Sequence, residues 1–314
     1  MAACWEPTVL SELVSHLANG SLHLFAGAGL SVLAGFPRWE DLLKKFASAY
    51  ERIPNFQQKF SEELPEMVSS QRIDIVDFLI DCGFEGKKQY AQILRETFFA
   101  QKRFHSVHER LLGLPFSGFI TTNYDRCFED CASQRDIKPY LANSRWFCYP
   151  PHQHVENPNP FQNIDGSEPY LLHMHGCIEA NGKVEAENII LSEKQYHEFY
   201  EKPEMKGLWT KCFYHNILFL GTSMKDPFFQ IVFNKVRSSS SSTNIANRKR
   251  CYFVFPESEK RGCPAIDEQR YDVIYSYFAD WDKGLEDMIG ELDWFYRSNQ
   301  NSVIAKPEIG LDNE

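Results

Sequence analysis

Four short segments of the sequence combine glycine or polar side chains in ways that suit contact with a phosphate, a sugar or a water molecule. They are Gly27-Ala28-Gly29-Leu30-Ser31, Thr121-Thr122-Asn123-Tyr124-Asp125, His173-Met174-His175-Gly176 and Gly221-Thr222-Ser223. An apolar run leads into each of them. This placement, repeated four times, favours one shared site over four unrelated turns.

The two glycine turns are suited to binding phosphate or ribose. Gly27 and Gly29 would let the backbone turn tightly beside a pyrophosphate, with the N–H groups of a following helix as donors. Gly221 is followed by two hydroxyl side chains, Thr222 and Ser223. Ordinary turns from a strand into a helix have a similar composition, so each segment alone leaves both interpretations open.

Asn123, Asp125 and the two histidines carry the groups best suited to holding a polar ligand or moving a proton. Asn123 or Asp125 could instead cap a helix, the more common role of these residue types. His173 and His175 share one face of a strand, but no third metal ligand is adjacent, so we expect no metal site. His173 is typical of a core histidine bonded to the backbone. His175, next to a glycine at a strand end, is the better candidate for a general base.

Short buried strands and helices must position these segments. Strands are expected at residues 22–26, 116–121, 170–176, 216–221, 251–255 and 272–275, with another short element at 189–192. Helices are expected at residues 8–19, from near 31, from near 39, at 127–131, around 196 and at 281–296. The alternation predicts an α/β fold with a parallel sheet flanked by helices. Ligands bind at the carboxyl ends of such strands, where the four segments lie.

The chain is expected to form one domain over residues 1–297. Residues 56–112 are helical and charged with little strand character, which indicates a helical insertion beside the sheet. Residues 148–168 predict an irregular loop and 238–243 a mobile one. Residues 298–314 are expected to be a disordered tail.

Charge and cysteine content indicate which partners the protein can bind and in which compartment it functions. The formal net charge of −10 argues against direct binding of nucleic acid. The nine cysteines are odd in number and include no C-x-x-C pair, which is typical of reduced thiols in a cytoplasmic protein. No signal peptide and no membrane segment are expected.

The order of the four segments resembles the sirtuin (SIR2) family. The resemblance runs from about residue 9 to about residue 296. It is closest to the SIR2-like domains of bacterial antiphage systems such as Thoeris, which carry similar stretches at residues 25–31, 121–125, 174–176 and 218–227. The resemblance implies a SIR2-like, DHS-type Rossmann fold and NAD as the substrate.

The resemblance also implies roles for individual residues. Asn123 and His175 would be catalytic, Asn123 orienting a water or the ribose hydroxyls and His175 taking a proton. The remaining residues expected to contact NAD are Gly27, Ala28, Gly29, Ser31, Thr122, Asp125, Gly221, Thr222 and Ser223. Within that set, the first turn would hold the phosphates and nearby ribose. Asp125 would support the loop or the nicotinamide end, and Thr222 and Ser223 the adenosine side.

Three departures from the family pattern shape the expected activity. Protein-deacylating sirtuins carry two C-x-x-C pairs between the last two segments, where this chain has only Cys177 and Cys212. That difference argues against a zinc module and against deacylation. Residues 36–39, Phe-Pro-Arg-Trp, differ from the usual sirtuin segment, so the lid over nicotinamide is expected to differ. Residues 298–314 are not expected to form a sensor domain of the Thoeris kind.

These features predict an NAD glycohydrolase that forms nicotinamide and ADP-ribose and serves as an immune or antiphage effector. Homo-oligomerisation, a partner defence protein or a ligand would regulate it. The alternatives are an NAD-dependent protein deacylase or ADP-ribosyltransferase, and a non-catalytic NAD-binding scaffold that forms oligomers.

Overall fold

The computed structural model describes most of the chain. The described residues are 4–53, 58–69, 74–99, 103–137, 146–148, 169–178, 182, 184, 189–212, 215–223, 249–258, 272–280 and 283–304. The loops predicted at 149–168 and 238–243, and residues 305–314 of the predicted tail, lie outside this set.

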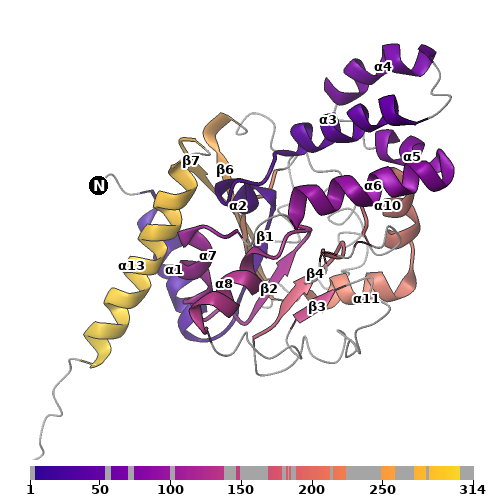
Figure 1. Ribbon diagram of the computed structural model, residues 1–314. Coiled ribbons are helices and arrows are strands. Elements are labelled where there is room, and N and C mark those ends of the chain that lie inside the picture. The colour runs from indigo at the N-terminus through magenta and orange to yellow at the C-terminus, as the bar shows by residue number, and fades with distance from the viewer. Residues whose placement is uncertain are drawn as a thin grey trace, which may run out of the picture.

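Seven parallel strands form one sheet at the centre of the molecule (Figure 1). Their order is β3-β4-β2-β1-β5-β6-β7. The strands are β1 (Leu22–Ala26), β2 (Gly118–Thr121), β3 (Trp146–Cys148), β4 (Leu171–His173), β5 (Asn216–Leu220), β6 (Arg250–Pro256) and β7 (Asp272–Phe278). The predicted α/β class with a parallel sheet is therefore confirmed.

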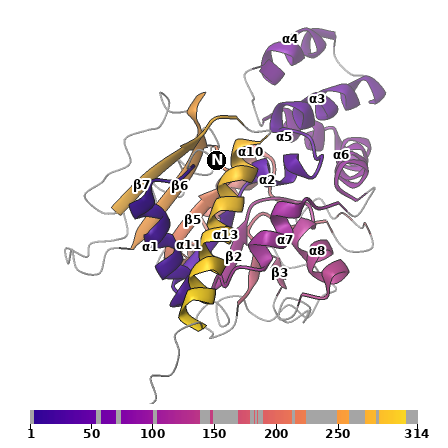
Figure 2. The same cartoon turned by 90° about the vertical axis from the view of Figure 1, so that its left-hand side faces the viewer.

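Alternate side chains of the strands build two separate cores. Leu22, Leu24 and Ala26 of β1 pack on one face with helices α1 (Pro7–Ala18), α7 (Ser106–Leu112), α8 (Cys127–Arg135) and α13 (Gly284–Ile304). Phe25 of β1 packs on the opposite face with α10 (Glu193–Tyr200) and α11 (Pro203–Cys212). Figure 2 shows α13 in front of the strands when the molecule is seen from the first face. Because both faces are covered, β1 and β5 are buried along their whole length.

A third core holds a layer of helices beside the carboxyl ends of the strands. It joins α3 (Trp39–Ala49), α4 (Gln58–Ser69), α5 (Asp74–Asp81) and α6 (Gly83–Phe98). A short turn of 3-10 helix, η1 (Tyr50–Arg52), follows α3. The helical region was predicted at 56–112, but α3 already belongs to this layer, whereas Val107 and Leu111 of α7 pack against the sheet. Its bounds follow from packing, which local composition does not encode.

Several element boundaries differ from the sequence prediction for local reasons. Strand β3 was not predicted; it has only three residues, too few to show a strand pattern. Strand β4 ends at His173, where a turn begins. Residues 189–191 form no strand; they lead to Ser192, whose side chain caps α10. Helix α2 (Ala28–Leu33) starts directly after Gly27 rather than near Ser31.

Helix α13 corrects the predicted start of the disordered tail. It continues to Ile304, so residues 298–304 are helical. The polar residues Ser298, Asn299 and Gln300 continue the helix beyond the part of α13 that packs against the core. The Arg297–Asp293 ion pair, with Nε and Oδ1 2.6 Å apart, lies one turn before this segment. Within the described residues, no helix is both long enough and apolar enough to cross a membrane.

Candidate functional site

The predicted site lies where the sheet changes direction. From β1 the chain first builds strands on one side, and after β4 it crosses to build β5, β6 and β7 on the other side. Strand β1 therefore has β2 on one side and β5 on the other, with loops leaving in opposite directions. A crevice at this switch point is the usual place for a ligand in a parallel sheet.

The turn after β1 packs tightly against the end of β5. The Gly27 N–H donates to Leu220 O at 2.8 Å, and the Gly29 N–H donates to Gly221 O at 2.7 Å. A Cβ on Gly27 would lie 2.7 Å from Thr222 Cγ2 and closer still to the Gly221 carbonyl. Gly221 itself has φ of +70°, a region that favours glycine. Both glycines are thus required by the approach of the two turns.

The same contacts limit what this turn can offer to a phosphate. The N–H groups of Gly27, Gly29 and Leu30 all donate to carbonyl oxygens of the protein. Ala28 is exposed and Gly29 is half-buried, so the outer edge of the turn is accessible. The predicted contact between this turn and the phosphates of NAD stays a prediction, with fewer backbone donors than the sequence pattern suggests.

Asn123 is fixed by two hydrogen bonds from its side-chain nitrogen. Nδ2 donates to Gly27 O at 3.0 Å and to Ser31 Oγ at 2.9 Å. Because the Gly27 carbonyl can only accept, the orientation of the amide is determined. Oδ1 accepts no hydrogen bond from the described residues, although the side chain is only 9% exposed. Asn123 therefore presents an oriented acceptor at the carboxyl end of β2.

Ser31 and Asp125 extend this network. Ser31 Oγ donates to Asp125 Oδ2 at 2.5 Å, so its single proton is committed to the carboxylate. Asp125 Oδ1 accepts from the N–H of Cys127 at the start of α8, at 3.0 Å. Asp125 thus bonds to the first N–H of α8, although Arg126 and not Asp125 is the N-cap residue of that helix. Through Ser31, Asp125 also supports the two contacts of Asn123 Nδ2, which together form the Asn123 clamp. Both residues are buried and act on Asn123 through Ser31 Oγ.

The loop after β2 is held from several directions. Thr121 Oγ1 donates to Ala26 O at 2.7 Å and accepts from the Asn123 N–H at 3.0 Å. Tyr124 OH donates to Ile190 O at 2.8 Å. Thr122, also predicted to contact NAD, is half-buried between these anchors. The loop is thus rigid around Asn123.

Thr222 carries an unusual hydroxyl. Its side chain is 4% exposed, and Oγ1 has no hydrogen-bond partner among the residues that the structure describes. A buried hydroxyl without a partner costs about 1–3 kcal/mol. A ligand hydroxyl or phosphate oxygen beside Gly27 would remove that cost, which supports the predicted role of Thr222. Ser223 follows it and is half-buried.

His175 lies in an aromatic cage formed by α10. Its Nε2 contacts the Tyr200 hydroxyl, its Nδ1 lies 3.4 Å from the Tyr196 hydroxyl, and Phe199 packs edge-on against the ring. Burial lowers the pKa of His175 to about 3, so the ring is neutral near pH 7. The structure connects His175 to the Asn123 loop through Ile190, whose N–H donates to His175 O and whose carbonyl accepts from Tyr124. Among the described residues, no hydrogen bond joins the side chains of His175 and Asn123.

His173 has a role in the site that the sequence did not reveal. Its Nδ1 bonds to Asn123 O at 2.9 Å, as expected for a core histidine bonded to the backbone. Its Nε2 lies 3.0 Å from Oε1 of Glu129, a buried carboxylate on α8. Burial alone would lower the pKa of His173, but the Glu129 carboxylate outweighs it and raises that pKa. The pair joins residues 44 positions apart, so no local pattern could indicate it.

Glu129, His173 and Cys177 also form a compact cluster of possible metal ligands. Their ligand atoms all lie within 4.8 Å of one another, and all three residues are buried. The sequence prediction of no metal site considered the two histidines and missed this set.

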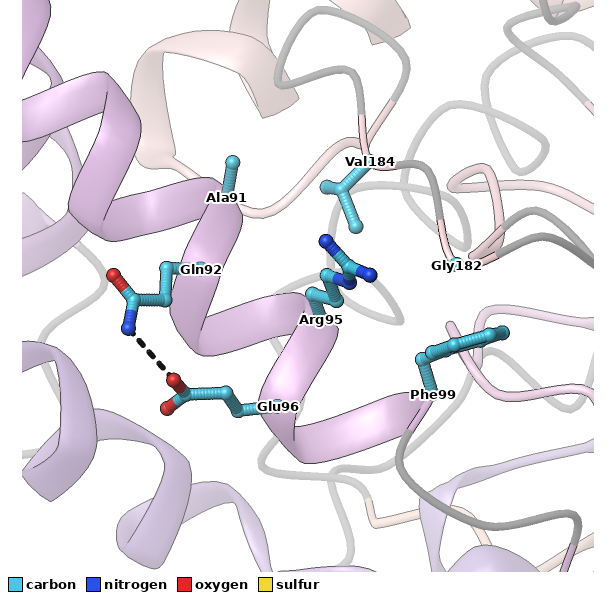
Figure 3. Close-up of a pocket in the computed structure, with 7 residues that line it drawn as sticks. All are labelled: Ala91, Gln92, Arg95, Glu96, Phe99, Gly182 and Val184. Atoms are coloured by element: carbon cyan, nitrogen blue, oxygen red, sulfur yellow. Dashed lines mark hydrogen bonds between the residues drawn. The ribbon is translucent and has the colours of Figure 1, made fainter.

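A cavity of about 670 Å³ lies elsewhere, along α6 (Figure 3). Figure 3 shows Arg95 pointing from α6 toward Val184, with Phe99 below Gly182. None of the predicted site residues lines it; the lining residues are Ala91, Gln92, Arg95, Glu96, Phe99, Gly182 and Val184. Next to it, Phe98 stacks on Phe36 and meets Tyr124 edge-on, with ring centroids 5.7 and 5.8 Å apart.

Comparison with known families gives a direct assignment. The family described as "SIR2-like domain" matches residues 117–277, just over half of the 314-residue chain. The chain belongs to the SIR2-like domain family. Asn123, His175 and Gly221 of this SIR2-like domain fall inside the matched residues, whereas the Gly27–Ser31 turn precedes them.

Curated relatives share limited identity with this SIR2-like domain. It is 24% identical over 238 residues to the NAD(+) hydrolase ThsA of Cytobacillus dafuensis, covering 74% of the chain and 41% of that protein. It is 24% identical over 323 residues to Defense-associated sirtuin 2 of Bacillus subtilis, covering 96% of the chain and 28% of that protein. Across five such relatives the chain spans 28% to 50% of their length.

Among solved structures, the SIR2-like domain is similar to a SIR2 homologue crystallised with NAD. That similarity has 13% sequence identity and a TM-score of 0.41, and covers 92% of this chain and 94% of the other.

Proposed function

We propose that this SIR2-like domain hydrolyses NAD to nicotinamide and ADP-ribose. The observation that carries the proposal is the Asn123 clamp, which holds an amide with both N–H groups engaged and Oδ1 outward at the switch point of the sheet. The names of the curated relatives, NAD(+) hydrolase among them, support the same activity.

The clamp suits the chemistry of this reaction. Cleavage of the bond between nicotinamide and ribose releases neutral nicotinamide and leaves positive charge on the sugar. Asn123 Oδ1 would accept a hydrogen bond from the attacking water or from a ribose hydroxyl, aligning it with that carbon. Water then supplies the new oxygen and releases one proton, so NAD and water give nicotinamide, ADP-ribose and a proton.

His175 is the proposed proton acceptor, and its surroundings set a condition on that role. A neutral ring can accept a hydrogen bond or a proton from a ribose hydroxyl. Proton transfer is most effective when the pKa of the base is near the working pH, whereas burial holds the pKa of His175 at about 3. A bound ribose would therefore need to reach a ring nitrogen of His175, where Nε2 contacts the Tyr200 hydroxyl and Nδ1 faces the Tyr196 hydroxyl.

The proposal is tested by incubating purified protein with NAD and separating the products by chromatography. Wild type should form nicotinamide and ADP-ribose in equal amounts without an acceptor protein or peptide. Asn123→Ala and His175→Ala should each lower the rate at least about 100-fold. His197→Ala, an exposed histidine of the same helix that covers His175, serves as the matched control and should retain full activity. Turnover that requires an acylated peptide or an acceptor protein would contradict the proposal.

We further propose that this hydrolase acts in defence and is regulated by self-assembly or by a partner protein. One curated relative is named a defence-associated sirtuin, and an unregulated hydrolase would exhaust cellular NAD. Specific activity should therefore rise with protein concentration, measured from nanomolar to micromolar protein. A specific activity that is independent of concentration, with no partner added, would contradict regulation by self-assembly.

A further inference from the structure

We infer that His173, held as a cation by Glu129, is a positioning residue that fixes the backbone of Asn123. The inference rests on the proposed function for its consequence in catalysis. Its structural part, a buried imidazolium bonded to the Asn123 carbonyl, can be measured without turnover.

The partners of the two ring nitrogens indicate a doubly protonated ring. Nδ1 lies 2.9 Å from Asn123 O and Nε2 lies 3.0 Å from Glu129 Oε1. A carbonyl oxygen and a carboxylate both accept hydrogen bonds, so each nitrogen must donate. A histidine that donates from both nitrogens carries a positive charge.

Two cations face the Glu129 carboxylate, whose Oε2 has no hydrogen-bond partner among the described residues. His173 and Glu129 are almost fully buried, with side-chain exposures of 3% and 2%. Arg126 adds a second cation, with Nη1 3.6 Å from Glu129 Oε1, and the Cys177 thiol lies next to the histidine. Glu129 is also in the first turn of α8, where a negative charge is favoured. Removing only one member would leave a buried charge without its partner and would destabilise the fold.

Both peptide groups that flank the Asn123 side chain are held, and the contact from His173 to one of them is called the brace below. The Asn123 N–H is held by Thr121 Oγ1, and its carbonyl is held by His173 Nδ1. These two contacts hold the backbone at the place from which Nδ2 reaches Gly27 O and Ser31 Oγ. Loss of the His173 donor would release the carbonyl and let the amide move away from the reacting carbon. Misplacement by about 1 Å can lower a rate by about 100-fold.

A metal ion bound by Glu129, His173 and Cys177 is the competing interpretation of the cluster. Such an ion would need a deprotonated Nε2 in place of the direct contact with Glu129, which is already at hydrogen-bond distance. It would also place two more positive charges close to Arg126. The contacts therefore favour the ion pair, and metal analysis of the purified protein separates the two.

Two double variants that differ only in the donor to Asn123 test the inference. Glu129→Gln removes the carboxylate charge in both. It is combined with His173→Leu, which has no donor, or with His173→Asn, whose side-chain nitrogen can replace Nδ1. We expect the leucine variant to lower kcat about 10- to 100-fold with little change in KM for NAD. The asparagine variant should recover most of kcat. Two folded variants with equal kcat would overturn the inference.

A second measurement is independent of activity. Nitrogen-15 NMR of labelled histidines, with His173 assigned through the asparagine variant, should show both of its ring nitrogens protonated at pH 7.5. A neutral His173 ring, or stoichiometric zinc in the purified protein, would overturn the inference. If the brace is present but wild type releases no nicotinamide, the proposed function fails and the structural inference stands.

Discussion

At the scale of single residues, the site is organised around the orientation of one amide. Asn123 is clamped by Gly27 and Ser31, and Ser31 is itself held by Asp125. The family resemblance implied that these residues act on NAD. The sequence could not indicate that Ser31 links Asn123 to Asp125, because its contacts with them span 92 and 94 positions of the chain.

His175 is expected to make the stability of the protein depend on pH. Its pKa in the folded protein is lowered by burial to about 3, against a usual value of about 6.5 in the unfolded chain. The unfolded state therefore takes up a proton first as pH falls. The stability that His175 contributes is complete above about pH 6.5 and is lost as pH falls toward 3.

The matching measurement is urea unfolding of wild type and His175→Phe at several values between pH 7 and pH 4. Below pH 6, wild type should lose up to about 1.4 kcal/mol per pH unit more than the variant, because one additional buried group must be protonated on unfolding. Parallel pH profiles for the two proteins would show that His175 is solvated in the folded state.

At the scale of elements, the approach of the β1–α2 turn to the end of β5 determines where Ser31 and Asn123 meet. The predictions for β1, β2, β5, β6 and β7 are close to the observed bounds because these strands are short, apolar runs ended by polar turns. The edge strand β3 and the helical layer from α3 to α6 were predicted less well. Their extent depends on partners distant in the chain, such as the contact of Phe98 with Tyr124.

Gly27→Ala should damage both stability and the site. A Cβ would collide with the backbone of Gly221 and with the methyl group of Thr222, and backbone cannot move aside cheaply. We expect a loss of about 1–3 kcal/mol in the free energy of unfolding, measured in urea, together with a lower rate of NAD cleavage.

Gly290→Ala is the matched control for that substitution. Gly290 lies within helix α13, and a Cβ at this position would meet only the flexible end of the Arg110 side chain. We expect it to be neutral or stabilising by about 0.5–1 kcal/mol, since alanine favours a helix more than glycine does. If both substitutions cost the same, the close approach of the two turns would not be the reason for glycine at position 27.

At the scale of the whole molecule, three cores meet around one loop. The sheet faces position β1, β2 and β5, and the helical layer from α3 to α6 reaches the same loop through Tyr124. His175 lies on the other side, under α10. Both ring nitrogens of His175 face tyrosine hydroxyls of α10, so access to the histidine from Asn123 depends on the position of that helix.

The most direct test of the account is the release of nicotinamide from NAD in water enriched in oxygen-18, followed by mass spectrometry of the second product. Folded wild type should release nicotinamide and form ADP-ribose that carries the heavy oxygen, and Asn123→Ala should do so at least about 100-fold more slowly. Equal rates for the two proteins, or ADP-ribose without the label, would contradict hydrolysis directed by the Asn123 clamp.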